Sequence, residues 1–232
     1  MIWVGTSGFQ YSEWKGTFYP NTLSTPKMLP FYASHFPTTE INYSFYRIPS
    51  EKTLTNWAVA TPERFRFSLK APQEITHVRK LRDCAPVLER FCEALNSLGG
   101  KLGAVLFQLP PVLRNDTALL KDFLAGLPPG LHSTFEFRHA SWLNDETFAA
   151  LKSKNTALCI ADTEKLTTPL MPTANFGYFR LRNLDYARAD IARWAEAIIQ
   201  QRGQWKDTYV YFRHEETGSG PKFARQLLEA LD

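Results

Sequence analysis

The sequence predicts an α/β protein with a single-domain (β/α)8 TIM-like barrel, and three observations lead to that fold class. Short apolar segments of strand length alternate with amphipathic helical segments over nearly all of residues 1–232. Eight such units fit the roughly 250 residues of a closed (β/α)8 barrel. The first strand is followed by Gly5-Thr6-Ser7-Gly8 and not by Gly-x-Gly-x-x-Gly, which disfavours a doubly wound dinucleotide-binding sheet.

The first half of the chain is expected to form four strands and three helices. Strands are predicted over residues 2–6, 39–46, 65–70 and 102–109, and helices over 27–35, 51–60 and 85–98. The third helix carries an apolar stripe and is expected to end at Gly99. The run 102–109 is almost wholly apolar, as expected for a parallel strand covered on both faces.

The second half repeats the pattern with one irregular connection. Strands are predicted over residues 133–138, 157–162, 178–182 and 208–213, and helices after the N-cap Asp116, over 144–154, over the run that ends at Gly203 and from Pro221 onward. The segment 163–175 contains two prolines and no helical period, so the sixth crossover is expected to be irregular.

Composition narrows the class of protein without naming a function. The 44% hydrophobic and 22% charged residues exclude disorder, and no apolar run approaches the length of a membrane span. The first strand begins at Ile2, which leaves no room for a signal peptide, and three cysteines fit a reducing compartment, so a cytoplasmic protein without membrane contact is expected. Cys84 and Cys92 lie eight residues apart on one expected helix, too far for a disulfide. The net charge of +4 suits anionic ligands but is too small for the basic stripe of a nucleic-acid protein.

Alternation along the strands predicts which side chains face the barrel interior. The outward positions are apolar: Ile41, Tyr43, Phe45, Phe65, Phe67, Leu69, Phe135, Phe137, Phe179 and Leu181. The inward positions are mostly polar: Glu40, Asn42, Ser44, Tyr46, Arg66, Ser68, Lys70, Glu136, Arg138, Tyr178, Arg180, Arg182, Tyr209, Tyr211 and Arg213. Because desolvating a charge is costly, these side chains are expected to share one polar cavity.

The charged positions gather at the predicted carboxyl ends of the strands, where barrels of this class carry their active sites. Strand ends fall at or beside Lys70, Gln108, Arg138, Asp162, Arg182 and Arg213. Cations outnumber carboxylates there, so an anionic ligand would balance the charge. The alternative is a structural ion-pair lattice, for example between Glu136 and Arg180.

A glycine-rich turn over residues 216–221 leads into the last predicted helix. Free amides at a helix start favour anions, and the loops after the last two strands often hold phosphate in such barrels, so Gly218, Ser219 and Gly220 are expected to bind phosphate or carboxylate. An ordinary helix start explains the same residues equally well.

Several segments together resemble one family, the YecE-like family or domain of unknown function 72. They are Gly5-Thr6-Ser7-Gly8 with Trp14, Phe18-Tyr19-Pro20, Thr39-Glu40-Ile41-Asn42 with Phe45-Tyr46, Phe67 with Lys70, Ile75-Thr76-His77, Gln108-Leu109-Pro110-Pro111, Glu136-Phe137-Arg138-His139 with Trp142, and Asp162. The resemblance implies a TIM-like barrel and draws attention to these positions, but it implies no reaction, substrate or cofactor. The chain departs from the family pattern at Arg182-Asn183 and Arg213-His214, which add cationic or titratable groups at the predicted mouth.

The preferred hypothesis is an enzyme, of hydrolase, lyase or isomerase type, that acts on a small phosphorylated or carboxylated substrate by acid/base chemistry. The candidate catalytic residues are Glu40, Lys70, Glu136 and Asp162. The candidate anion-binding residues are Ser7, Asn42, Tyr46, His77, Gln108, Arg138, His139, Trp142, Arg180, Arg182, Arg213, Gly218, Ser219 and Gly220. Lys70 is expected either to contact the anion or, in a dry cavity, to act as a base or form a Schiff base.

Two other hypotheses stay open. Glu40, Glu136, Asp162, His77, His139 and His214 could hold a divalent metal for a hydrolase or phosphodiesterase, on nucleic acid if Tyr11, Trp14, Tyr46 and Trp142 stack bases. No metal-binding motif is present and no cofactor is required by the sequence. The same polar mouth could also belong to a noncatalytic ligand-binding barrel. The oligomeric state does not follow from the sequence.

Overall fold

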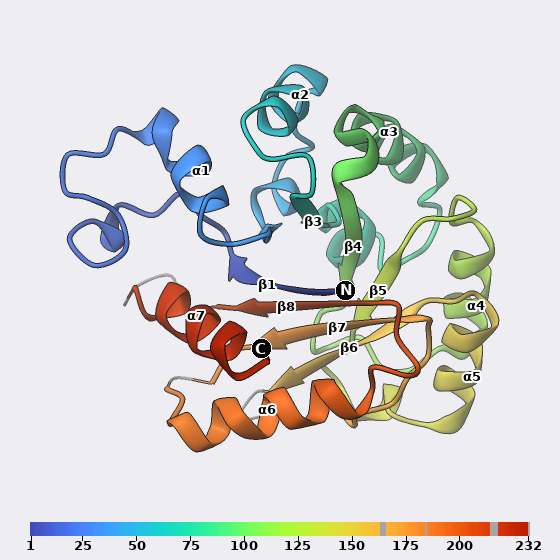
Figure 1. Ribbon diagram of the computed structural model, residues 1–232. Helices are drawn as coiled ribbons and strands as arrows, with labels where there is room; N and C mark the ends of the chain where they lie inside the picture. Colours follow the sequence, from blue (N-terminus) through green and yellow to red (C-terminus); the bar gives the residue numbers. More distant parts are fainter. Residues whose placement is uncertain (163–165, 184, 214–217, 232) are drawn as a thin grey trace.

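Eight parallel strands close into a barrel at the centre of the molecule (Figure 1). The computed structural model describes residues 1–162, 166–183, 185–213 and 218–231. The strands are β1 (Ile2–Ser7), β2 (Thr38–Ile41), β3 (Arg66–Lys70), β4 (Leu102–Gln108), β5 (Ser133–Glu136), β6 (Ala157–Asp162), β7 (Phe176–Leu181) and β8 (Asp207–Phe212). Each strand pairs with the next, and β8 closes against β1 with Tyr209 opposite Trp3. The predicted (β/α)8 barrel is therefore confirmed.

Helices follow the strands on the outside of the barrel. They are α1 (Thr25–Ala33), α2 (Glu51–Val59), α3 (Ala85–Leu95), α4 (Thr117–Ala125), α5 (Asp145–Ser153), α6 (Arg188–Gln200) and α7 (Ser219–Leu231). The side chains of Ser50, Asp116 and Asn144 accept backbone N–H bonds and so start α2, α4 and α5, as capping residues do. No helix occurs in the described part of the sixth crossover, residues 166–175, which agrees with the predicted irregular connection.

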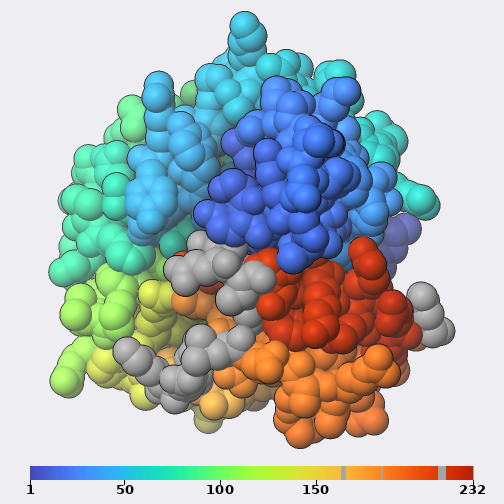
Figure 2. Space-filling view, turned by 90° about the vertical axis from the view of Figure 1, so that its left-hand side faces the viewer, coloured from blue at the N-terminus to red at the C-terminus, as the bar shows by residue number. Residues whose placement is uncertain are grey.

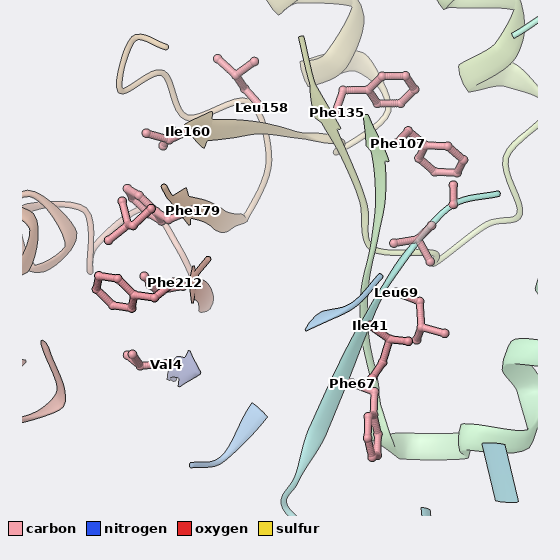
Figure 3. Close-up of a cluster of buried hydrophobic side chains, with 14 of the residues drawn as sticks. Val4, Ile41, Phe67, Leu69, Phe107, Phe135, Leu158, Ile160, Phe179 and Phe212 are labelled. Carbon is pink, nitrogen blue, oxygen red and sulfur yellow. The ribbon is translucent and has the colours of Figure 1, made fainter. Parts of the chain in front are cut away.

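The alternation of side chains produces two separate apolar clusters. The outer cluster lies between sheet and helices and takes residues from all eight strands, among them Val4, Ile41, Phe67, Phe107, Phe135, Leu158, Ile160, Phe179 and Phe212 (Figure 3). The inner cluster fills the barrel with intervening residues, such as Trp3, Ala104, Leu106, Cys159, Phe176, Tyr178, Tyr209 and Tyr211. Apolar side chains thus fill part of the barrel interior, and the buried polar side chains share the rest.

The prediction for residues 42–46 is wrong. β2 ends at Ile41, and Tyr43–Phe45 form a short 3-10 helix, η2. Alternation requires extended backbone, and Asn42 already has helical torsion angles, φ −91° and ψ −20°. Tyr43 is therefore exposed, and Phe45 does not join the outer cluster but lies under the ammonium of Lys70.

Other predicted elements also end earlier than expected, α3 and β5 among them. α3 stops at Leu95, and a 3-10 segment, η4 (Asn96–Lys101), follows it, with Gly99 at φ +53°. β5 ends at Glu136, so Arg138 lies in the following loop and not in the strand. Cys84 is the residue before α3 and Cys92 lies within it; both are free, as is Cys159. Among the described residues, no helix is both long and apolar enough to cross a membrane.

Gly5 permits the close approach of β1 and β2. A Cβ atom at this position would lie 2.0 Å from the carbonyl oxygen of Thr38, a backbone atom that cannot move without breaking the register. We expect Gly5→Ala to lower the free energy of unfolding by about 1–3 kcal/mol or more, because overpacking forces backbone shifts. Urea denaturation measures this, with Gly100→Ala as the control, since a Cβ atom at Gly100 meets no atom within 4 Å. Equal stability of the two variants would contradict the close-approach argument.

Candidate functional site

The carboxyl ends of all eight strands lie at one end of the barrel, which we call the mouth. In Figure 1 the arrowheads of β6, β7 and β8 point toward this end, and Figure 2 views the molecule from that side. The N-terminal segment and α7 lie side by side on this face (Figure 2), where Thr17 and Phe18 share a pocket with the first residues of α7. The candidate residues at the strand ends belong to different strands, but because the strands are parallel these residues all lie at the mouth.

Glu40 is held by four donors inside the barrel. It is fully buried on β2, and it accepts hydrogen bonds from Ser7 Oγ at 2.6 Å, from Tyr178 Oη at 2.7 Å and from Arg180 Nη2 at 2.9 Å. Arg180 Nε donates a further bond at 3.2 Å, and Asn42 Nδ2 donates to Ser7 Oγ at 2.6 Å. Burial alone would raise the pKa of Glu40, but the charge of Arg180 and these hydrogen bonds lower it. Glu40 is thus an ionised, fully engaged carboxylate.

Glu136, the last residue of β5, is the second buried carboxylate, and it forms salt bridges with three arginines. Its Oε1 accepts bonds from Gln108 Nε2 at 2.8 Å, from Arg182 Nη1 at 2.9 Å and from Arg138 Nε at 3.2 Å. Its Oε2 pairs with Arg180 Nη1. Burial opposes ionisation, but the positive charges of these arginines, Arg180 first, hold the pKa of Glu136 far below its usual range. The structural ion-pair lattice considered from the sequence is therefore present.

The lattice does not balance its charge. Three arginine side chains face two glutamates, and each nitrogen of the Arg180 guanidinium is used. Burial lowers the pKa of Arg182 to about 10, and the positive charges of Arg180, Arg138 and Arg213 contribute to the lowering. Among the described side chains of this ion-pair lattice, positive charge is thus in excess, and it is carried by the partly exposed side chains of Arg138 and Arg182.

Lys70 adds a titratable amine to the same end of the barrel. It is the last residue of β3 and is partly buried, with Nζ 3.7 Å from the centroid of the Phe45 ring. Within the described residues its side chain has no hydrogen bond or salt bridge. Burial and the charge of Arg180 lower the pKa of Lys70 to about 7, although Glu40 and Glu136 act in the opposite direction. Lys70 therefore exchanges its proton in the neutral pH range.

His77 packs against the same aromatic ring as Lys70, that of Phe45. It belongs to a π-helical turn, η3 (Glu74–Val78), and its ring meets the Phe45 ring edge-on, with centroids 4.9 Å apart. Its Nδ1 bonds to Thr76 Oγ1 at 2.8 Å. Burial and the charges of Lys70 and Arg138 lower the pKa of His77, which favours the neutral imidazole. The structure thus brings His77 and Lys70 together around Phe45.

Asp162 and Arg213 lie at the mouth but outside the two carboxylate clusters. Asp162 Oδ1 accepts the backbone N–H of Arg182 at 2.6 Å, and its Oδ2 accepts the hydroxyl of Tyr186. The carboxylate therefore fixes the connection between β7 and α6 and touches no arginine side chain in the described structure. Arg213 follows β8 directly, is exposed, and bonds through its backbone N–H to Leu181 O at 3.0 Å.

Three other predicted residues lie away from the carboxylate clusters. Trp142 is fully buried, stacks on Phe137 at 4.8 Å, and donates its indole N–H to Leu113 O at 2.8 Å, so it belongs to the core. His139 uses Nδ1 to accept the N–H of Ser141 and caps a short 3-10 turn. Tyr46 is 73% exposed and lines a pocket beside the mouth.

The glycine-rich turn is described only in part. Gly218 has φ +66°, a Cβ atom there would lie 2.9 Å from Thr17 Oγ1, and Ser219 and Gly220 begin α7. Residues 214–217, which include His214, are outside the described residues. Phosphate binding by Gly218, Ser219 and Gly220 therefore stays a prediction.

No metal site is apparent in the part of the chain that the structure describes. No group of three or more His, Cys, Asp and Glu side chains there is placed to hold a metal ion. The predicted ligands Glu40 and Glu136 use their oxygens for ion pairs, and His214 is not described. The donor set does not fit a divalent cation, because three arginines already surround Glu136.

Two residues of the site are not among the predicted site residues. Tyr178 is predicted to face the barrel interior but not to belong to the site, although its hydroxyl donates to Glu40. Phe45 is predicted on the outer face because the strand is expected to continue through it. The only sequence signal for Tyr178 is a polar end on an inward aromatic residue, which also fits ordinary packing.

Comparisons with known proteins agree with this architecture. A DUF72 family protein (TM1631) from Thermotoga maritima has a solved structure that matches with a TM-score of 0.87 and 27% identity, over 100% of this chain and 99% of that one. A DUF72 family protein (EF0366) from Enterococcus faecalis shows the same fold, with a TM-score of 0.85, 23% identity and coverage of 100% and 95%. The UPF0759 protein YunF of Bacillus subtilis is 26% identical over 275 residues, which cover 100% of this chain and 95% of YunF. The model of the family "Protein of unknown function DUF72" matches residues 3–232, and the chain therefore belongs to the DUF72 family.

Proposed function

We propose that this protein is an enzyme that acts on a small anionic substrate at the barrel mouth, with Lys70 as the acid/base group. One observation carries the proposal: Arg138, Arg180 and Arg182 converge on Glu136, while Lys70 at the same end forms no salt bridge with any described carboxylate. An anion bound between these side chains would supply the missing negative charge. Arginine suits this role because its planar fork matches carboxylate and phosphate oxygens.

The contacts of the three arginines divide their roles. Arg180 is buried and spends every guanidinium nitrogen on Glu40 and Glu136, so it is a positioning residue. Arg138 uses only Nε and Arg182 only Nη1 of their side chains in the described structure, and their other nitrogens are the proposed contacts for the anion.

The two buried glutamates are poor proton donors, because their lowered pKa keeps them ionised and their oxygens are occupied by hydrogen bonds. They orient the arginines instead. Lys70 is neutral in a useful fraction of molecules near pH 7, which is the property a general base or its conjugate acid requires. Hydrolysis, elimination and isomerisation are the reaction types that such a group supports.

A noncatalytic ligand-binding barrel is the second candidate. The observation that favours it is the complete engagement of Glu40 and Glu136 in ion pairs, which leaves Lys70 as the acid/base group of the proposal. In that case Arg138 and Arg182 bind the anion in the same way, but no reaction follows.

Sulfate binding tests the anion site, since the charge of sulfate is constant between pH 5 and 9. We expect calorimetry to show an affinity that weakens as the pH rises through about 7, because Lys70 then loses its proton and its attraction for the anion. Arg138→Met should weaken binding about tenfold or more, since a charge-assisted hydrogen bond is lost. Arg193→Met, which removes an exposed α6 arginine paired with Asp190, serves as the control. A sulfate affinity that changes neither with pH nor in Arg138→Met would contradict the proposal.

A further inference from the structure

A pocket lies beside the mouth, and Phe45, which packs under Lys70, lines it. This pocket has a volume of about 380 Å³ and is lined by residues that include Phe45, Tyr46, Arg47, Pro72, Val78 and Arg90. Its size is within the roughly 300–1,000 Å³ range of small-molecule sites. Pro72 comes two residues after Lys70, and Lys70 Nζ lies 3.7 Å from the centroid of the Phe45 ring. The pocket is therefore adjacent to the proposed acid/base group.

The walls of this pocket expose apolar surface. Tyr46 is 73% exposed and Val78 is 70% exposed, both far above what core residues show. Tyr46 packs edge-on against the ring of Phe45, with centroids 5.1 Å apart. The exposed ring of Tyr46 thus lies beside the ring of Phe45, which already contacts the ammonium of Lys70. An exposed aromatic ring of this kind can stack on a planar apolar group of a ligand.

One wall of the pocket comes from an unusual backbone turn. Glu74–Val78 form a π-helical turn, a rare structure that often occurs at functional sites. Glu74 and Val78 of this turn line the pocket, and the ring of His77 packs edge-on against the ring of Phe45. The turn therefore brings this wall of the pocket against Phe45.

We propose that this pocket binds the planar apolar part of the substrate whose anionic group lies at the mouth. The substrate class is then an anion that carries an aromatic or similar flat group. This inference rests on the proposed function, since it assigns the second half of the same ligand. Charge agrees with the assignment: Arg47, Arg90 and Glu74 line the pocket, and Glu74 is paired with Arg79 at 3.0 Å and with Arg90 at 3.9 Å, so its carboxylate is partly neutralised toward an incoming anion.

The test compares two probes that differ only in the flat group, methyl phosphate and phenyl phosphate. We expect the wild-type protein to bind phenyl phosphate about tenfold more tightly, the value of one stacked and partly buried ring. Tyr46→Ala should reduce this preference to nearly one. Tyr43→Ala is the matched control, because Tyr43 is 52% exposed on the same 3-10 turn but does not line the pocket, and it should keep the preference.

The outcomes separate the inference from the proposed function. Equal affinity for the two probes, with both weakened by Arg138→Met, would overturn the inference and leave the anion site standing. A preference for phenyl phosphate that survives Tyr46→Ala would also overturn it, because the ring would then bind elsewhere. If neither probe binds in a manner that depends on Arg138, the proposed function fails and the inference fails with it. Circular dichroism of each variant shows that the fold is retained.

Discussion

Replacing Arg180 with methionine is expected to lower the free energy of unfolding by about 3–5 kcal/mol, the cost of leaving buried charges without their partner. Arg180 is 2% exposed and pairs with both Glu40 and Glu136, whose side chains are 0% and 2% exposed. Methionine fills most of the volume but offers no positive charge. Two carboxylates would then lie in the barrel with Ser7 and Tyr178 as the remaining partners of Glu40, and with Gln108 and the outer arginines as those of Glu136. Urea denaturation at pH 8 measures the loss.

The pH dependence of this loss gives a sharper test. Both glutamates have lowered pKa values in the folded protein, so their ion pairs stabilise it above the unfolded pKa of about 4.3, and this stability is lost as the pH falls through the folded values. In Arg180→Met the glutamates lose their main cation and burial raises their pKa, so they take up protons at higher pH than in the wild type and the penalty relaxes as the pH falls. The difference between wild type and variant should therefore be smaller at pH 4 than at pH 8.

Arg138→Met is the matched control for Arg180→Met. Arg138 pairs with the same Glu136, but its side chain is 31% exposed and only its Nε takes part. We expect it to change the free energy of unfolding by less than about 1 kcal/mol, as for exposed ion pairs. Similar losses in the two variants, or a loss for Arg180→Met that is independent of pH, would contradict the assignment of Arg180 as the buried counter-ion.

Glu136 and Arg180 could be predicted as interior residues because β5 and β7 remain extended and their apolar partners mark the outer face. Phe135 and Phe179 lie in the outer cluster, and the residue that follows each of them points inward. The alternation of side chains in a strand is exact, so one clear apolar face determines the other. The same logic explains why the barrel itself and the polar character of its mouth could be predicted from hydrophobic period.

For Phe45 and Trp142, hydrophobic alternation does not predict the direction of the side chain. Both follow a strand end, and there the torsion angles of single residues decide the direction of a side chain. Asn42 turns the chain into a 3-10 helix, which moves Phe45 from the outer face to a position beneath Lys70. Trp142 is on a similar turn after β5, but it packs on Phe137 in the core. Hydrophobic pattern cannot distinguish these two aromatic residues, because turn geometry is set by local hydrogen bonds and not by periodicity.

Lys70→Met is expected to lower kcat/KM by about 10²–10⁴-fold for an anion that binds at the mouth and is turned over, the usual contribution of one acid/base group. Phosphorylated or carboxylated compounds whose binding depends on Arg138 are the substrates for this assay, and the rate should follow the ionisation of a group with a pKa of about 7. Lys154→Met is the control, because Lys154 is an exposed residue that follows α5 and therefore lies toward the opposite end of the barrel.

The same lysine can be observed without any substrate, which separates its pKa from its role. After reductive methylation with a 13C label, one lysine resonance should titrate near pH 7, and it should be missing from Lys70→Met. Addition of sulfate should move this titration to higher pH, because a bound anion stabilises the ammonium form. If the resonance titrates near pH 7 and sulfate raises its pKa while no anion is turned over, the mouth binds anions without catalysis and the protein is a noncatalytic ligand-binding barrel. If Lys70 titrates as an ordinary exposed lysine, burial and the arginines do not act on it as the geometry requires, and both the acid/base role and the pH dependence of anion binding are wrong.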